Sequence, residues 1–266
     1  MGGTARPYVS DERRRARLAA RHRLLAHLRT DDVVTIADDL VALHSSDPVT
    51  VYLSAIVRMR DPDVAAVEAA LYDDRSLVRH HAMRRTIWVM SPTVAVAAHA
   101  SSTRKIAAAE RRKVLQWLAA SPEVDDPERW LAEATARVLA LVAERGTVLT
   151  REIGQTFPDL TVELVAGAGT RNPTPIPAHT RVPLLAAFEG RLIRARPVGS
   201  WTSGQYAWAL LEGWSPGFAL DGDVAARAGA ADLVARLLRS FGPATDEDLR
   251  WWTGWTKGQT STALTD

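Results

Sequence analysis

One order of elements is predicted twice along this chain: three helices, then a pair of short strands. In the first copy, apolar residues at helical spacing precede two runs with strand propensity, 77–79 and 86–89. In the second copy the strands are 191–195 and 205–209. Three helices followed by a hairpin is the order of a winged helix, a variant of the helix-turn-helix. The repetition predicts a mainly α-helical protein with small β-hairpins, in the α+β class, built from tandem winged-helix domains.

The predicted boundaries divide the chain into four segments. Winged-helix domain 1 covers residues 1–91, a connecting helical segment covers 92–124, and winged-helix domain 2 covers 125–218. An acidic stretch between Pro122 and Pro127 marks the second boundary. The last segment, 219–266, shows helical patterns without a following hairpin. We therefore expect an incomplete third winged-helix domain, truncated before its strands.

A polar hexapeptide, residues 43–48, lies between two apolar helical runs in the first copy. Asp47 followed by Pro48 is a strong helix start, because the carboxylate accepts from free N–H groups and proline has no N–H to leave unpaired. His44, Ser45 and Ser46 are then left in a turn between two short helices. The buried faces of those helices are predicted from Ile36, Ala37, Leu40 and Val41 before the turn, and from Leu53, Ile56 and Val57 after it.

Local signals predict several other features. Residues 11–29 read as one basic amphipathic helix whose buried stripe is Leu18, Leu24, Leu25 and Leu28. In the second copy, Thr150 is a predicted N-cap, Gly146 a predicted C-cap, and the proline-rich stretch 166–179 a predicted loop. Thr245 and Asp248 have the spacing of a capping box.

Composition excludes several classes of protein. The 266 residues include 47% hydrophobic and 24% charged residues, as in ordinary globular proteins, and no cysteine, so disulfides and thiolate metal sites are excluded. No apolar run is long enough for a membrane span or a signal peptide. His80 and His81 are adjacent and point apart on a strand, and Gly167-x-Gly169 precedes no convincing helix. We expect a cytoplasmic monomer without membrane, metal or nucleotide cofactor.

Basic residues gather on the predicted hairpins although the net charge is only +2. The candidates for contact with double-stranded DNA are Arg79, His80, Arg84 and Arg85 on the first hairpin, Arg194, Arg196, Trp201 and Gln205 on the second, and Lys257 and Gln259 in the last helix. Alternatives stay open. The first hairpin can be a solvated tip, Trp201 can pack against its own hairpin, and Trp251, Trp252 and Trp255 read chiefly as core.

Four motifs occur in an order that resembles a known family. They are Leu43-His44-Ser45-Ser46-Asp47-Pro48, Leu77-Val78-Arg79-His80-x-Ala82-Met83-Arg84-Arg85-Thr86, Gly199-Ser200-Trp201-x-Ser203-x-Gln205-Tyr206 and Trp251-Trp252-Thr253-Gly254-Trp255-Thr256. Together they resemble the winged-helix DNA-binding family that includes the AlkZ and YcaQ-type DNA glycosylases. The resemblance extends from about residue 12 to the end of the chain.

The resemblance implies a curved stack of winged-helix units, followed in relatives by a β-rich domain, that clasps duplex DNA. Characterised relatives hydrolyse the N-glycosidic bond of bulky alkylated bases and position the water with a Gln-x-Gln pair in the first unit. In this chain the pair falls at His44 and Ser46, neither of which is glutamine. Subfamilies with histidine at the first position keep His44 as a candidate.

The candidate catalytic residues are therefore His44, Ser46 and Asp47. His44 can accept a proton from water, Ser46 can hold the same water, and Asp47 can stabilise a sugar cation. Each has a structural alternative, since a turn histidine can satisfy helix ends and Asp47 is a predicted cap. Two functions remain open: a DNA glycosylase, or a non-catalytic winged-helix DNA-binding protein or regulator.

Overall fold

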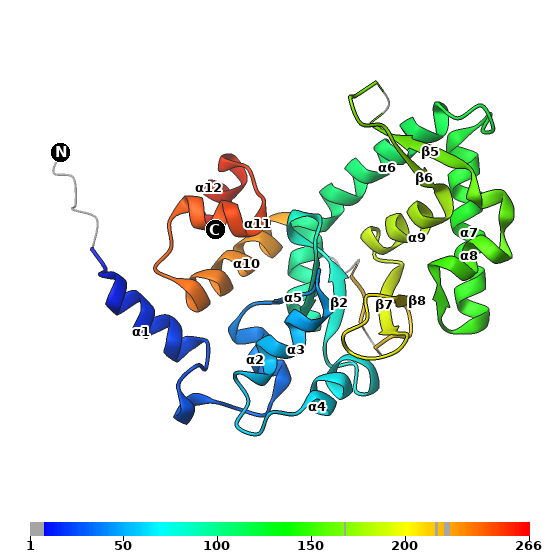
Figure 1. The fold of residues 1–266 in the computed structure, drawn as a ribbon. Helices are drawn as coiled ribbons and strands as arrows, with labels where there is room; N and C mark the ends of the chain where they lie inside the picture. The colour runs from blue at the N-terminus through cyan, green and yellow to red at the C-terminus, as the bar shows by residue number, and fades with distance from the viewer. Residues whose placement is uncertain (1–7, 168, 216–217, 221–223) are drawn as a thin grey trace, which may run out of the picture.

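The computed structural model describes residues 8–167, 169–215, 218–220 and 224–266. The fold combines many helices with three small antiparallel sheets, so the predicted α+β class is confirmed (Figure 1). Among the described residues, no helix is both long and apolar enough to cross a lipid bilayer.

The N-terminal basic helix is shorter than predicted. Helix α1 runs over Asp11–Arg21, and a 3-10 turn follows at Ala26–Leu28. The helix does not continue past this point because Arg23, two residues beyond its end, adopts a positive φ of 55°. The Arg23 guanidinium binds Asp39 and the carbonyl of Leu28. None of the helix is buried and Leu24 is 45% exposed, so the predicted leucine stripe is wrong.

The first repeat contains the predicted helices and one strand that was not predicted. Helices α2 (Val33–Asp39) and α3 (Pro48–Ile56) flank the two-residue strand β1 (Leu43–His44). Asp47 caps α3 with Pro48 in its first turn, as predicted. Leu53 is 51% exposed and Val57 is exposed too, so the predicted buried face of α3 is wrong for both.

The remainder of the first repeat leads into a hairpin. Helix α4 (Val64–Glu68) continues as a π-helical turn, and β2 (Val78–His81) and β3 (Ile87–Met90) form the predicted strands. Between them, the 3-10 turn Met83–Arg85 makes what we call the hairpin tip. Strand β1 pairs with β3 to give the order β1-β3-β2, in which His44 lies opposite Trp88.

A long helical segment joins this sheet to the second repeat. It consists of α5 (Pro92–Ala98), a π-helical turn (His99–Thr103) and α6 (Arg104–Ala119). The second repeat begins with α7 (Pro127–Arg145), ended by Gly146 at a φ of 74°, which confirms the predicted C-cap. The elements that follow are β4 (Val148–Leu149), α8 (Thr150–Thr156), β5 (Glu163–Ala166), β6 (Thr174–Pro177), α9 (Ala178–Phe188), β7 (Leu192–Pro197) and β8 (Tyr206–Leu210).

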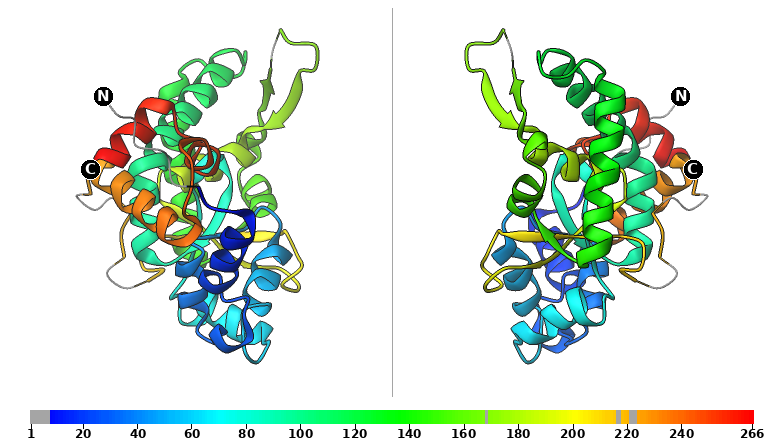
Figure 2. Two further views of the ribbon diagram at one scale, coloured as in Figure 1. Left: turned by 90° about the vertical axis from the view of Figure 1, so that its left-hand side faces the viewer. Right: turned by 90° about the vertical axis from the view of Figure 1, so that its right-hand side faces the viewer.

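Two local predictions fail in the second repeat. The predicted loop at 166–179 is largely a β5–β6 hairpin that projects from the rest of the fold (Figure 2). Pro175 and Pro177 fit there because each strand of a two-stranded sheet is an edge, where a missing N–H donor is tolerated. Thr150 is not the N-cap of α8. Leu149 holds that position, and the Thr150 hydroxyl instead accepts from the indole of Trp208.

The second main sheet has the topology of the first. Strand β4, between α7 and α8, pairs with β8 to give the order β4-β8-β7. In each repeat, a two-residue strand between helices therefore joins the later strand of a hairpin. The two sheets also contact each other through β2 and β7.

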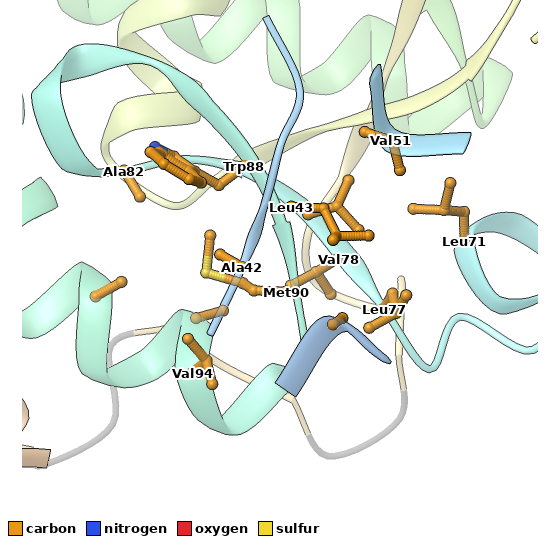
Figure 3. Close-up of a cluster of buried hydrophobic side chains, with 14 of the residues drawn as sticks. Ala42, Leu43, Val51, Leu71, Leu77, Val78, Ala82, Trp88, Met90 and Val94 are labelled. Carbon is orange, nitrogen blue, oxygen red and sulfur yellow. The ribbon is translucent and has the colours of Figure 1, made fainter. Parts of the chain in front are cut away.

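The C-terminal helices pack against the first repeat. They are α10 (Ala226–Phe241), α11 (Asp246–Thr253) and α12 (Lys257–Thr265), and the predicted capping box of Thr245 and Asp248 is confirmed. Helix α10 lies against α5 so closely that a Cβ on Gly229 would sit 2.9 Å from the carbonyl oxygen of Ala97. The core of the first repeat, in which Leu43, Val78 and Met90 of the three strands gather (Figure 3), is continuous with buried residues of α10 and β7. The domain boundaries stay a prediction.

Candidate functional site

The turn after β1 brings His44 and Ser46 together at the surface. Oγ of Ser46 lies 3.2 Å from Nε2 of His44. The His44 imidazole is half-buried because its ring packs edge-on against the Trp88 indole, with ring centroids 4.9 Å apart. Ser46 is exposed. The arrangement places one ring nitrogen and one hydroxyl side by side within reach of solvent, and we call it the His44 corner.

Two neighbouring residues fix the turn of the His44 corner: Ser45 on its interior side, and Asp47 at the start of α3. Ser45 is buried, its N–H donates to the Ile87 carbonyl at 2.8 Å, and its hydroxyl accepts from Arg79 at 2.9 Å. Asp47 accepts from the N–H of Val49 at 3.1 Å as the cap of α3. That hydrogen bond supports the structural interpretation of Asp47, and its predicted catalytic role stays a prediction.

Arg84 of the hairpin tip lies beside the His44 corner. Its guanidinium carbon is 5.7 Å from the Trp88 ring centroid and 4.7 Å from that of Trp251, a residue of α11. Arg84 is exposed and has no carboxylate partner within the part of the chain that the structure describes. Desolvation lowers the pKa of His44, and the positive charge of Arg84 lowers it further. The neutral imidazole is therefore favoured near pH 7.

The backbone of the hairpin tip is strained. Arg84 and Arg85 have φ angles of 56° and 62°, in a region that residues with a Cβ rarely adopt. Such strain costs on the order of 1 to 3 kcal/mol and often marks functional positions. The Arg85 side chain is half exposed and pairs with Glu110 of α6, at 3.0 Å.

The structure argues against two of the predicted DNA contacts, Arg79 and His80, because their side chains are buried. Arg79 is 2% exposed and donates to Ser45 and to the Tyr72 hydroxyl. His80 is also buried, with Nε2 3.2 Å from Nδ1 of His99. Burial holds the pKa of His80 well below its usual value. Both strand faces are covered because β7 and α9 pack against β2, so neither side chain reaches a phosphate at the surface.

The second hairpin presents fewer free groups than predicted. Arg194 stacks on Trp208, 3.6 Å from the ring centroid, and burial lowers its pKa to about 10. Arg196 pairs with Glu68 at 2.8 Å and with Asp73 at 2.9 Å, so its charge is neutralised by the first repeat and its placement gives no support to a DNA contact.

The other candidates on the second hairpin and the last helix are more accessible. Trp201 packs on Tyr52 of α3, with ring centroids 5.1 Å apart, rather than standing free. Gln205 is exposed. Lys257 is exposed at the start of α12, and Gln259 caps that helix by accepting from the N–H of Thr256 at 3.2 Å. DNA contacts by these residues stay predictions.

Trp251 is the residue of this site that sequence reasoning missed. The interpretation of the tryptophan cluster as core is right for Trp255, which is buried, and wrong for Trp251, which is 68% exposed. Its position beside Arg84 depends on how α11 packs against the hairpin tip. Trp251 lies one helical turn after Glu247 and Asp248, which are exposed, and this spacing on α11 is the signal that it faces outward.

No cluster of three or more histidine and acidic residues suited to a metal ion occurs in the described part of the chain. The groups that lie at and beside the His44 corner are an imidazole, a hydroxyl, indoles and a guanidinium.

Comparisons with known proteins agree with the motif order. A family model described as DNA glycosylase AlkZ-like matches residues 37–266. No curated protein matches the chain. Among solved structures, the DNA glycosylase AlkZ of Streptomyces sahachiroi aligns with a TM-score of 0.63 and 18% sequence identity. That alignment covers 95% of this chain and 64% of the other, so the chain spans less than two thirds of the length of that protein.

Proposed function

The chain belongs to the AlkZ-like DNA glycosylase family, and on this premise we propose that it binds double-stranded DNA and hydrolyses the N-glycosidic bond of a bulky alkylated base at the His44 corner. The contact between His44 and Ser46, beside the Arg84 guanidinium that has no carboxylate partner among the described residues, carries this proposal. These groups come from β1, the turn after it and the hairpin tip, and His44 is half-buried while Ser46 and Arg84 are exposed.

The two repeats are proposed to be winged-helix domains. Their shared topology supports this, because each has a short strand between helices that joins the later strand of a hairpin. In winged-helix proteins, the hairpin and one helix contact the duplex. The exposed Arg84 and Lys257 are the proposed phosphate contacts, with Arg85, Gln205 and Gln259 as further polar contacts.

The proposed reaction needs a positioned water more than a strong acid. An alkylated purine carries a positive charge and leaves as a neutral base, so the leaving group requires little protonation. Water held between Nε2 of His44 and Oγ of Ser46 attacks C1′ of the sugar as the bond from C1′ to the base nitrogen breaks. The water proton passes to the neutral His44 imidazole, which its lowered pKa keeps available.

The test is base release from duplex DNA that contains a single 7-methylguanine or a bulkier N7 adduct. We expect release by the unmodified protein, with His44→Ala slowing it by about 100-fold and Ser46→Ala by about 10-fold, in the range of general-base effects. His27→Ala is the matched control, because His27 is exposed in the turn after α1 and lies outside the corner.

The same experiment separates the alternative function. If no base is released while duplex binding remains strongly dependent on salt, the non-catalytic DNA-binding protein or regulator is the correct interpretation. If His44→Ala releases base at the rate of the unmodified protein, the corner is not the catalytic site.

A further inference from the structure

A hollow of about 310 Å³ lies between the hairpin tip, α6 and the turn between α11 and α12. His44 and Ser46 do not line it. Its floor includes Trp255, whose indole N–H donates to the buried Ser102 hydroxyl at 2.8 Å. We call it the α6 cavity.

The α6 cavity carries an excess of positive charge. Arg84, Arg85, Lys105 and Lys113 line it, with Glu110 as its acidic residue. Glu110 is shared, because it lies 3.0 Å from Arg85 and 2.9 Å from Lys113. Neither Arg84 nor Lys105 has a carboxylate partner among the described residues. Cations gathered in a concave surface concentrate the field and attract an anion.

Hydrogen-bond donors at the same cavity suit the oxygens of a phosphate. Gln259 lines the cavity, and its side-chain oxygen is already used, since it accepts from the N–H and the hydroxyl of Thr256 at 3.2 and 3.1 Å. Its amide nitrogen has no partner in the described residues and is left to donate. Arginine and lysine side chains supply the remaining donors, as in most phosphate contacts of proteins.

Arg84 links the α6 cavity to the His44 corner. It lines the cavity, and its guanidinium also stacks on Trp251 and influences the imidazole of His44. Gly254, which also lines the cavity, approaches Arg84 closely, because a Cβ there would be only 3.1 Å from Cγ of Arg84. A ligand in the cavity would therefore contact a side chain whose charge also acts on His44.

We propose that the α6 cavity binds one phosphodiester group of the DNA backbone and thereby fixes the position of the duplex relative to the His44 corner. The inference rests on the proposed function in one respect, which is that DNA is the ligand. The size and charge of the cavity suit a single phosphate with part of its sugar rather than a long stretch of backbone.

The first experiment fills the α6 cavity without changing charge. Ala109 lines it on α6, whereas the neighbouring Ala108 is exposed and does not line it. We expect Ala109→Phe to weaken binding of an undamaged duplex by about tenfold at low salt, and the control Ala108→Phe to bind within twofold of the unmodified protein. Equal affinities for the two variants would overturn the proposal.

A second pair of variants covers the case in which Ala109→Phe does not fold. Lys105 and Arg112 are both exposed cations on α6, and only Lys105 lines the cavity. We expect Lys105→Gln to lower the affinity for DNA about fivefold. The slope of log affinity against log salt concentration should also fall by close to one unit, because about one counterion fewer is released on binding. Arg112→Gln is expected to have a smaller effect on both, and an equal effect of the two would contradict a discrete site.

The phosphate itself is located with duplexes that carry one neutral methylphosphonate linkage at successive positions. We expect one position to weaken binding of the unmodified protein about fivefold, and the same linkage to have no further effect on Lys105→Gln. The other source of this chemistry is a free phosphate, tested by titration with inorganic phosphate and with a nucleoside monophosphate. Saturable binding of either, lost in Lys105→Gln, with no sensitive linkage in DNA, would overturn the backbone assignment.

These measurements are independent of base release. If the methylphosphonate position is found but no adduct is excised, the catalytic function fails and the α6 cavity stands. If base is released while Ala109→Phe and Lys105→Gln bind DNA as the unmodified protein does, the cavity proposal fails and the catalytic function stands.

Discussion

Nε of Arg79 donates a hydrogen bond to Oγ of Ser45 across 2.9 Å in the interior of the protein. The same guanidinium donates to Tyr72 and lies 4.4 Å from the ring centroid of Tyr206, so it joins the His44 corner to both repeats. No carboxylate in the described residues pairs with Arg79. Hydrogen bonds and aromatic rings therefore stabilise its charge, and Ser45 is held in place between His44 and Ser46.

Replacement of Arg79 tests this interior role. Arg79→Ala removes hydrogen bonds from a charged donor and leaves a cavity, so we expect the free energy of unfolding to fall by about 3 kcal/mol. Arg79→Met retains most of the packing and is expected to cost about 1 kcal/mol. Urea unfolding measures both. Folded Arg79→Met should bind undamaged DNA with an affinity within twofold of that of the unmodified protein. A tenfold lower affinity would instead support a contact between Arg79 and a DNA phosphate.

The pH dependence of base release reports on the pair of His44 and Arg84. If neutral His44 accepts the proton, the rate falls with acid as the imidazole protonates, with a midpoint below the usual histidine value. Arg84→Gln removes a positive charge that lowers the pKa of His44, so the midpoint should move to higher pH. Single-turnover rates at saturating protein separate this shift from weaker DNA binding. A midpoint that stays in place would show that Arg84 does not act on His44.

Stability should fall with acid because several histidines are buried in their neutral form. Desolvation lowers the pKa of His80 strongly, lowers that of His81 to about 3, and also lowers that of His22. Since the unfolded chain binds these protons first, their contribution is complete above about pH 6.5 and is lost as the pH falls toward the folded values. Each contributes a slope of about 1.4 kcal/mol per pH unit within that window.

Urea unfolding between about pH 5 and pH 6.5 measures this slope before most carboxylates titrate. His81→Gln removes one proton-binding group, so the slope of the free energy of unfolding against pH should fall by about 1.4 kcal/mol per pH unit. This holds whatever the substitution does to stability at neutral pH. His27→Gln is the control, because His27 is exposed in the turn after α1 and is not one of the buried histidines. An unchanged slope in His81→Gln would mean that His81 is not held neutral in the folded protein.

Local signals in the sequence were sufficient for most elements and their ends. The caps at Asp47 and Thr245 depend on neighbours within three residues, so the order of helices and hairpins was predictable. Strand β1 was not, because two residues become a strand only by pairing with β3, more than 40 positions later. Pro175 and Pro177 suggested a loop, since no local signal shows that a strand has a free edge.

The candidate site was predictable in its polar corner and not in its surroundings. His44 and Ser46 lie two residues apart, so their proximity follows from the turn. Whether Arg79 reaches the surface depends on the packing of the second repeat on β2, which residue types do not reveal. Trp251 and Arg84 meet across 167 positions of sequence, and only the docked α11 brings them together.

The turn at Gly254 allows the position of Arg84 to be tested against a matched control. Gly254 and Gly146 both have a positive φ, 76° and 74°, so alanine is strained at either position, although their ψ angles differ, at 16° and −51°. Nothing lies within 4 Å of a Cβ at Gly146, whereas a Cβ at Gly254 meets Arg84 at 3.1 Å. We therefore expect both variants to lose stability, which urea unfolding measures for each, but only folded Gly254→Ala to bind duplex DNA about fivefold more weakly. Only Gly254→Ala pushes against Arg84, whereas alanine at Gly146 contacts nothing. If both variants bind DNA equally well, the position of Arg84 beside this turn does not matter for DNA recognition.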